Sequence, residues 1–149
     1  MAEIGFYHLT RTSIDAAAPK LLGRILAGGG RAHVLCGTAE RMEALDASLW
    51  LSTDPDWLPH GRSDTEHARH QPILLATGDV APVNGARFLL LLDGASTMRA
   101  SEYDRVLDLF DGNDEGATAA ARARWASAKA AGHGLSYMKQ GAKGWEKAG

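Results

Sequence analysis

The fold class is decided by two short apolar runs in the middle of the chain, PILLAT at residues 72–77 and RFLLLL at residues 87–92. Neither run alternates apolar with polar side chains, and this pattern is typical of strands that are buried on both faces, as in parallel sheets. Residues 79–85 separate the runs, and Asp93-Gly94 ends the second one. We therefore expect two strands inside a sheet that is covered on both sides.

Working outward, strand-like and helix-like segments alternate. Residues 4–9 and 31–36 combine aromatic and branched side chains, which favours strands, and apolar residues recur at near-helical spacing from Ile14 to about Ala27 and over 39–49. The glycines at 28–30 end the first of these helices, because glycine enters left-handed geometry at little cost.

Towards the carboxyl end, Asn113 or Asp114 can cap a helix that runs to Ala131, and residues 135–139 form a last short strand. The segment 103–110 fits helix or strand, and the polar stretch 62–70 is expected to be irregular. The alternation predicts an α/β fold over residues 1–149: a single three-layer domain with a mostly parallel sheet.

Such a fold resembles nucleotide-binding domains, but the phosphate loop is missing. No glycine lies between Leu9 and Ser13, and the glycines at 28–30 follow a helix instead of a strand. We therefore expect no bound cofactor.

Composition excludes several classes of protein. The chain has 149 residues, of which 45% are hydrophobic and 23% charged, as in ordinary globular proteins. Cys36 is the one cysteine, so no intramolecular disulfide can form and a cytoplasmic location is expected. The longest apolar run is far too short to span a bilayer, so no membrane partner is expected.

Charge is unevenly distributed along the chain. Residues 116–149 carry six basic side chains and one acidic one, which gives +5 there and leaves −7 for residues 1–115 of the net −2. A basic end on an acidic body indicates an anionic partner at that end, although solubility alone explains it equally well.

Catalytic and metal-binding patterns are weak. His60, His67 and His70 could ligate zinc, and with them a small metal- or nucleotide-dependent hydrolase remains an alternative. A solvated histidine-rich loop explains the same residues, and Cys36 fits a core strand. We therefore expect no catalytic residues and no bound metal.

The last helix carries the most suggestive pattern. Arg122, Trp125 and Lys129 are spaced so that they share one face, while most other positions of this helix are alanine. An aromatic ring between two cations suits an acidic peptide with an apolar end. The alternative is that Trp125 anchors the helix to the core and the cations form its wet rim.

The loop after the second helix is unusually apolar, with Trp50, Trp57 and Leu58. These side chains either seal the core or form a docking patch for another subunit.

Taken in order, these stretches resemble the chi subunit family of bacterial DNA polymerase III holoenzyme. The resemblance rests on FYHL at 6–9, DASLW at 46–50, WLPHG at 57–61 (Trp57 standing where phenylalanine is usual), PILL at 72–75, VLDLF at 106–110 and the RARW…G pattern of Arg122 to Trp125 with Gly132. It covers nearly the whole chain and favours a strand for 103–110.

The resemblance implies a non-catalytic accessory subunit of the replicative polymerase. Members of the family pair with the psi subunit, which tethers them to the clamp loader, and bind the acidic, phenylalanine-ended tail of single-stranded DNA-binding protein (SSB). It places tail recognition on Arg122 and Trp125, with Lys129 at another matching basic position. Ala126 stands where better-known members carry a basic residue, so either the basic pocket is weaker here or Arg124 or Lys139 supplies the missing charge.

Contact with psi or another clamp-loader subunit is expected at Trp57, Leu58, Pro59 and His60, and Trp50 is expected in the core. DNA would be met only indirectly. A third interpretation is direct binding of single-stranded DNA by the basic end, where Trp125, Tyr137 and Trp145 could stack on bases.

Overall fold

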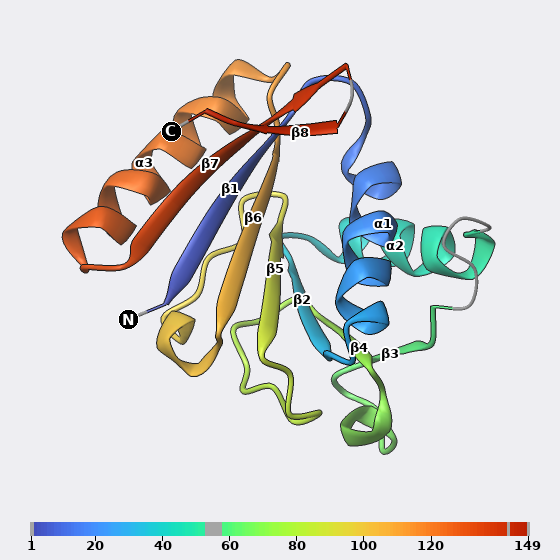
Figure 1. The fold of residues 1–149 in the computed structure, drawn as a ribbon. Helices are drawn as coiled ribbons and strands as arrows, with labels where there is room; N and C mark the ends of the chain where they lie inside the picture. Colours follow the sequence, from blue (N-terminus) through green and yellow to red (C-terminus); the bar gives the residue numbers. More distant parts are fainter. Residues whose placement is uncertain (1, 53–57, 143, 149) are drawn as a thin grey trace.

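An eight-stranded sheet forms the middle of the molecule (Figure 1). The computed structural model describes residues 2–52, 58–142 and 144–148. The strand order is β3-β4-β2-β5-β6-β1-β7-β8, and the pairs from β3 to β7 are parallel while β8 runs antiparallel to β7. The strands are β1 (Glu3–Leu9), β2 (Ala32–Cys36), β3 (His60–Arg62), β4 (Ile73–Ala76), β5 (Phe88–Leu92), β6 (Arg105–Asp111), β7 (Gly134–Gly141) and β8 (Gly144–Lys147).

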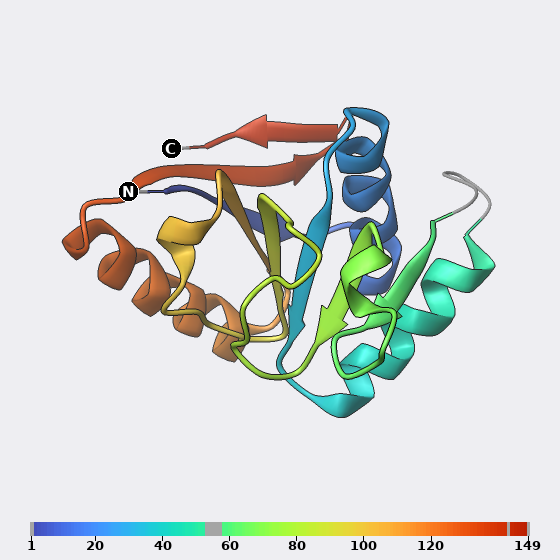
Figure 2. The ribbon, with the colours of Figure 1, turned by 90° about the horizontal axis from the view of Figure 1, so that it is seen from below.

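Helices cover both faces of this sheet. Helices α1 (Ile14–Ala27) and α2 (Ala39–Leu51) lie on one face, and α3 (Glu115–Ala130) lies on the other (Figures 1 and 2). The connection between β5 and β6 adds Ala100 and Tyr103 to the α3 side. This arrangement confirms the expected three-layer α/β fold with a mostly parallel sheet.

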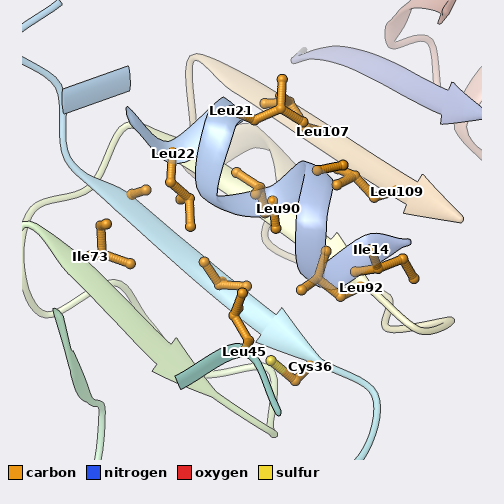
Figure 3. Packing of buried hydrophobic residues seen from close by; sticks show 14 of the residues in the cluster. Ile14, Leu21, Leu22, Cys36, Leu45, Ile73, Leu90, Leu92, Leu107 and Leu109 are labelled. Carbon is orange, nitrogen blue, oxygen red and sulfur yellow. The ribbon is translucent and has the colours of Figure 1, made fainter. Parts of the chain in front are cut away.

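The uninterrupted leucines of β5 supply both cores. Successive side chains of a strand point to opposite faces, so Leu90 and Leu92 pack under α1 and α2, while Leu89 and Leu91 pack on the α3 side. Figure 3 shows Leu90 and Leu92 beside Ile14 and Leu22 of the first core. An alternating strand could fill one core only, which is why this run indicated a covered sheet.

Short polar side chains fix where the helices begin. The Ser13 hydroxyl accepts a hydrogen bond from the Ala16 amide at 3.2 Å, and Asp114 accepts one from the Ala117 amide at 3.0 Å. Gly29 has φ of +82° directly after α1, in the left-handed region that favours glycine. The helix ends inferred from sequence are confirmed to within two residues.

Two elements differ from the expectations. The stretch expected to be irregular begins with the end of the short strand β3 and contains a 3₁₀ turn at Ala68–His70. The end of the chain adds β8, whose Trp145 packs against Tyr7 with ring centroids 4.9 Å apart. Both strands are edge strands, so the sheet could add them without any strong pattern of their own.

Within the described ranges, no helix combines the length and apolar character that crossing a membrane requires.

Candidate functional site

Arg122 and Trp125 line one pocket, here called the aromatic pocket, on the α3 side of the sheet. The pocket has a volume of about 230 Å³, and its walls are Phe110, Thr118, Ala121, Arg122, Trp125 and Tyr137. These residues come from β6, α3 and β7, which lie side by side because β1 joins β6 to β7. Three of the six walls are aromatic and one, Arg122, is an exposed cation, so the pocket offers an apolar interior with one positive charge.

Trp125 serves the core and the pocket together. It is half-buried and packs against the second core, with its ring 5.3 Å from that of Phe6 and 6.0 Å from that of Tyr137, both in edge contacts. The same side chain lines the aromatic pocket. The two interpretations of Trp125 are therefore compatible: its packing holds the ring in place for a ligand.

The other predicted cations are distributed differently. Lys129 is exposed on α3, one turn beyond Trp125, and is not among the residues that line the pocket. Lys139 of β7 and Arg122 both lie close enough to His8 to lower the pKa of its imidazole, after burial, which is the largest cause. Positive charge thus gathers beside the pocket from α3 and β7.

Arg124 lies away from this pocket. Its Nε donates to Asp108 Oδ2 at 2.7 Å and one terminal nitrogen donates to Asp108 Oδ1 at 2.9 Å. Asp108 is 2% exposed, and burial raises the pKa of its carboxyl while the Arg124 guanidinium opposes that change. Two residues along a helix turn by about 200°, so Arg122 and Arg124 point to different sides of α3. The structure therefore does not bring Arg124 together with Arg122.

Arg124 and Asp108 instead line a second cavity of about 570 Å³. It lies between α3 and the connection that joins β5 to β6, with apolar walls that include Phe6 and Leu91. A buried carboxylate needs its cation, so the pair has a structural role in this wall.

The wall of the aromatic pocket is supported from behind by His8 of β1. Its Nδ1 and the Tyr137 hydroxyl form a hydrogen bond, and its ring lies in edge contact with Phe110 at 5.1 Å between centroids. A Cβ atom at Gly112 would come within 2.0 Å of His8 Cδ2 and 2.7 Å of the Leu9 carbonyl oxygen, so glycine at this turn makes room for the ring.

The end of α2 is more exposed than the sequence predicted. Trp50 is 70% exposed and Leu51 is 79% exposed, so the expectation that Trp50 lies in the core is wrong. The buried stripe of α2 is Leu45 and Leu49, and the next residue along a helix is turned about 100° away from it. The Trp50 ring lies against that of His60 in a tilted contact, with ring centroids 4.9 Å apart.

Of the residues expected to contact psi or the clamp loader, Leu58 and His60 are buried and Pro59 is half-buried. Trp57 lies outside the described residues. The His60 ring is held at 2.8 Å by Asp46 Oδ1 and at 2.8 Å by the Leu58 carbonyl. His60 therefore supports Leu58 and the exposed Trp50 from within.

The three histidines of the hydrolase alternative do not form a site. His60 is buried against Asp46, whereas His67 pairs with Glu66 at the surface. In the part of the chain that the structure describes, no group of three or more His, Cys, Asp or Glu side chains is placed to bind a metal ion. Cys36 is buried in the first core, and burial raises the pKa of its thiol to about 12.

Sequence reasoning missed Phe110 and Tyr137 as walls of the pocket and His8 as the residue that supports them. They come from three neighbouring strands, and strand order is set by long-range pairing that periodicity does not reveal. The one available signal was that Tyr7-His8-Leu9 and Leu109-Phe110-Asp111 both end strands, where side chains of a parallel sheet meet at one edge.

The family comparison agrees with the motifs. The family described as DNA polymerase III chi subunit, HolC, matches residues 1–136 of the chain. No curated protein matches the chain.

Proposed function

Because the chain belongs to the family of the DNA polymerase III chi subunit, we propose that it is a non-catalytic accessory subunit that links the clamp loader to SSB. In this proposal it binds the acidic C-terminal tail of SSB in the aromatic pocket. The observation that carries the proposal is that Arg122 and Trp125, separately expected to recognise the tail, line one pocket with Phe110 and Tyr137.

The pocket suits the end of such a tail chemically. A phenylalanine ring fits among aromatic walls, where edge contacts between rings add to the burial of apolar surface. The terminal carboxylate can pair with the Arg122 guanidinium, which has no protein acceptor within the described residues. Acidic residues further along the tail would meet Lys129 and Lys139.

The absence of a basic side chain at Ala126 is compensated by Lys139 in this proposal. Arg124 is held by Asp108 and is unavailable without leaving that carboxylate buried and unpaired. Tail binding therefore depends on Arg122 as its main cation and on lysines from two elements as secondary ones.

Contact with psi or another clamp-loader subunit fits the patch made by Trp50 and Leu51 on α2. Exposed tryptophan and leucine side chains next to each other are typical of protein interfaces. This patch lies on the α1–α2 side of the sheet and the aromatic pocket on the α3 side, so both partners can bind together (Figure 1).

The test is titration of the protein with a short acidic peptide that ends in phenylalanine, followed by calorimetry at low salt. We expect Arg122→Ala to weaken binding about tenfold, because a charge-assisted pair is lost. Raising salt from about 0.05 M to about 0.3 M should weaken binding of the unaltered protein by a similar factor.

Arg105→Ala is the matched control, because it removes an exposed arginine at the opposite end of β6 from Phe110. Equal affinity of Arg122→Ala and the unaltered protein at low salt would show that the site is assigned wrongly. Binding of a single-stranded oligonucleotide as tight as that of the peptide would favour the DNA-binding alternative.

A further inference from the structure

His8 stands behind the aromatic pocket and contacts two of its walls. Its Nδ1 and the Tyr137 hydroxyl share a hydrogen bond, and its ring lies against Phe110 and Tyr137 with centroid separations of 5.1 Å and 5.8 Å. Tyr137 and Phe110 both line the pocket. A change in the protonation of His8 therefore acts directly on Tyr137 and Phe110, two walls of the aromatic pocket.

The charged groups around His8 come from all the elements that surround it. Arg122 of α3 and Lys139 of β7 disfavour its protonated form, as does partial burial, whereas Asp111 of β6 and a backbone hydrogen bond at Gly112 favour that form. Cations outnumber the single carboxylate. In the empty site the imidazole is therefore mainly neutral at neutral pH, and its pKa is lowered.

Neutral and protonated His8 differ in the direction of their hydrogen bond with Tyr137. When its Nε2–H is directed at the Gly112 backbone, neutral His8 accepts a hydrogen bond at Nδ1 from the Tyr137 hydroxyl. Protonated His8 carries a proton on both nitrogens, so Nδ1 donates to the Tyr137 oxygen and the hydroxyl proton is free to turn elsewhere.

An anion in the pocket evens the balance of charge at His8, where two cations face one carboxylate in the empty site. A carboxylate paired with Arg122 offsets the guanidinium charge that disfavours protonation and adds a negative charge nearby. By linkage, an anion that favours the protonated imidazole is itself bound more tightly when the imidazole is protonated.

We propose that His8 is a proton-linked part of the aromatic pocket: a peptide carboxylate that binds there is accompanied by uptake of a proton at His8, so affinity rises as pH falls below neutral. This inference rests on the proposed function, because it requires that the pocket bind the carboxylate end of an acidic peptide. His8 acts here as a positioning residue, through Tyr137 and through the local charge.

The experiment measures the affinity of a short acidic, phenylalanine-ended peptide at about pH 7.5 and about pH 5.5 at constant ionic strength; the peptide carboxylates remain ionised in this range. We expect binding about threefold tighter at the lower pH, because the bound carboxylate raises the pKa of His8 and the imidazole takes up a proton. The same peptide with an amidated carboxyl end should bind more weakly and lose most of the pH dependence.

His8→Gln keeps a polar side chain that does not titrate, and it should bind the peptide with the same affinity at both pH values. His67→Gln is the matched control, since the His67 side chain is 72% exposed on another part of the surface; it should keep the threefold change. In the unaltered protein, NMR should show the titration midpoint of the His8 ring moving to higher pH when the peptide is added, a readout that needs no variant.

Peptide binding that is independent of pH, or unchanged pH dependence in folded His8→Gln, would overturn the role of His8 and leave the proposed function standing. A protein that binds no peptide at either pH would overturn the proposed function, and this inference with it.

Discussion

Residues of the same type have different roles in this chain, depending on which groups surround their side chains. Arg122 and Arg124 are two positions apart, yet the first lines the aromatic pocket and the second neutralises the buried Asp108. His8 and His33 are both strand histidines, yet one stands beside a pocket and the other is fully buried. Residue type alone does not separate these roles, because they follow from the surroundings of each side chain.

His33 makes stability depend on pH. It is 0% exposed, its Nδ1 lies 3.0 Å from the Tyr103 hydroxyl, and burial lowers its pKa from 6.5 to about 4. Between these values the unfolded chain binds a proton that the folded protein does not, so the free energy of unfolding falls as pH falls from 6.5 towards 4. The loss due to His33 should reach about 3 kcal/mol at the lower end.

Urea unfolding at a series of pH values measures this effect. The variant His33→Phe should lose about 3 kcal/mol less than the unaltered protein over the same interval, while carboxylates contribute equally to both. His67→Gln, at the surface, should follow the unaltered protein. Parallel curves for His33→Phe and the unaltered protein would contradict the assignment.

At the scale of elements, α2 divides its apolar side chains between the core and the exposed surface. Leu45 and Leu49 are buried under the helix, and Trp50 is exposed one residue later. The helix is short of charged residues on its exposed end, where Trp50 and Leu51 form a patch. An exposed tryptophan contributes little to folding, so its presence is better explained by a partner than by stability.

Substitutions at two neighbouring positions of α2 test this difference between a buried and an exposed side chain. Leu49→Ala should lower the free energy of unfolding by about 3 kcal/mol, because it removes a side chain that is 3% exposed. Trp50→Ser should change it by about 0.5 kcal/mol or less. Urea unfolding of the two variants checks this, and a large loss in Trp50→Ser would mean that the indole belongs to the core.

At the scale of the whole molecule, the connection that follows β1 is joined to the end of β7, at the carboxyl ends of these two strands. Gln140 near the end of β7 accepts hydrogen bonds at its Oε1 from the amides of residues 10, 11 and 12, at 3.2, 2.8 and 3.1 Å. These amides lie in the connection from β1 to α1, where nucleotide-binding folds place a phosphate loop. Here the three amides donate to the Gln140 side chain of the same protein, which accords with the absence of a glycine fingerprint.

Gln140→Ala should therefore loosen the junction between β1, α1 and the β7–β8 hairpin. Three donors lose their acceptor, and we expect a loss of about 2 kcal/mol in the free energy of unfolding. Hydrogen exchange at residues 10–12 should become faster while the amides of α2 keep their protection. Gln140→Glu retains an acceptor oxygen and should keep slow exchange; fast exchange in both variants would show that the oxygen is not the important contact.

The family match extends this scale to the assembly. The chain belongs to a replication family, and its fold presents the exposed Trp50–Leu51 patch and the aromatic pocket on opposite sides of one sheet. A rigid parallel sheet between the two keeps them at a fixed separation, which suits a connecting subunit.

The sequence by itself determined the layers of the fold, the helix ends and two residues of the pocket. Unbroken apolar runs required a sheet with two covered faces, serine and aspartate marked the helix starts, and helical spacing placed Arg122 near Trp125. These features depend on residues a few positions apart, whose relative geometry a helix or strand fixes in advance.

Long-range packing set which strands neighbour β1, and with them the pocket walls Phe110 and Tyr137 and the position of His8 behind them. It also decided that Arg124 faces Asp108 and that Trp50 faces outward, against the expectation for Trp50. These outcomes depend on pairing between segments as far apart as β1 and β7. Such pairing is settled by the packing of the whole chain, so no local pattern of residues records it.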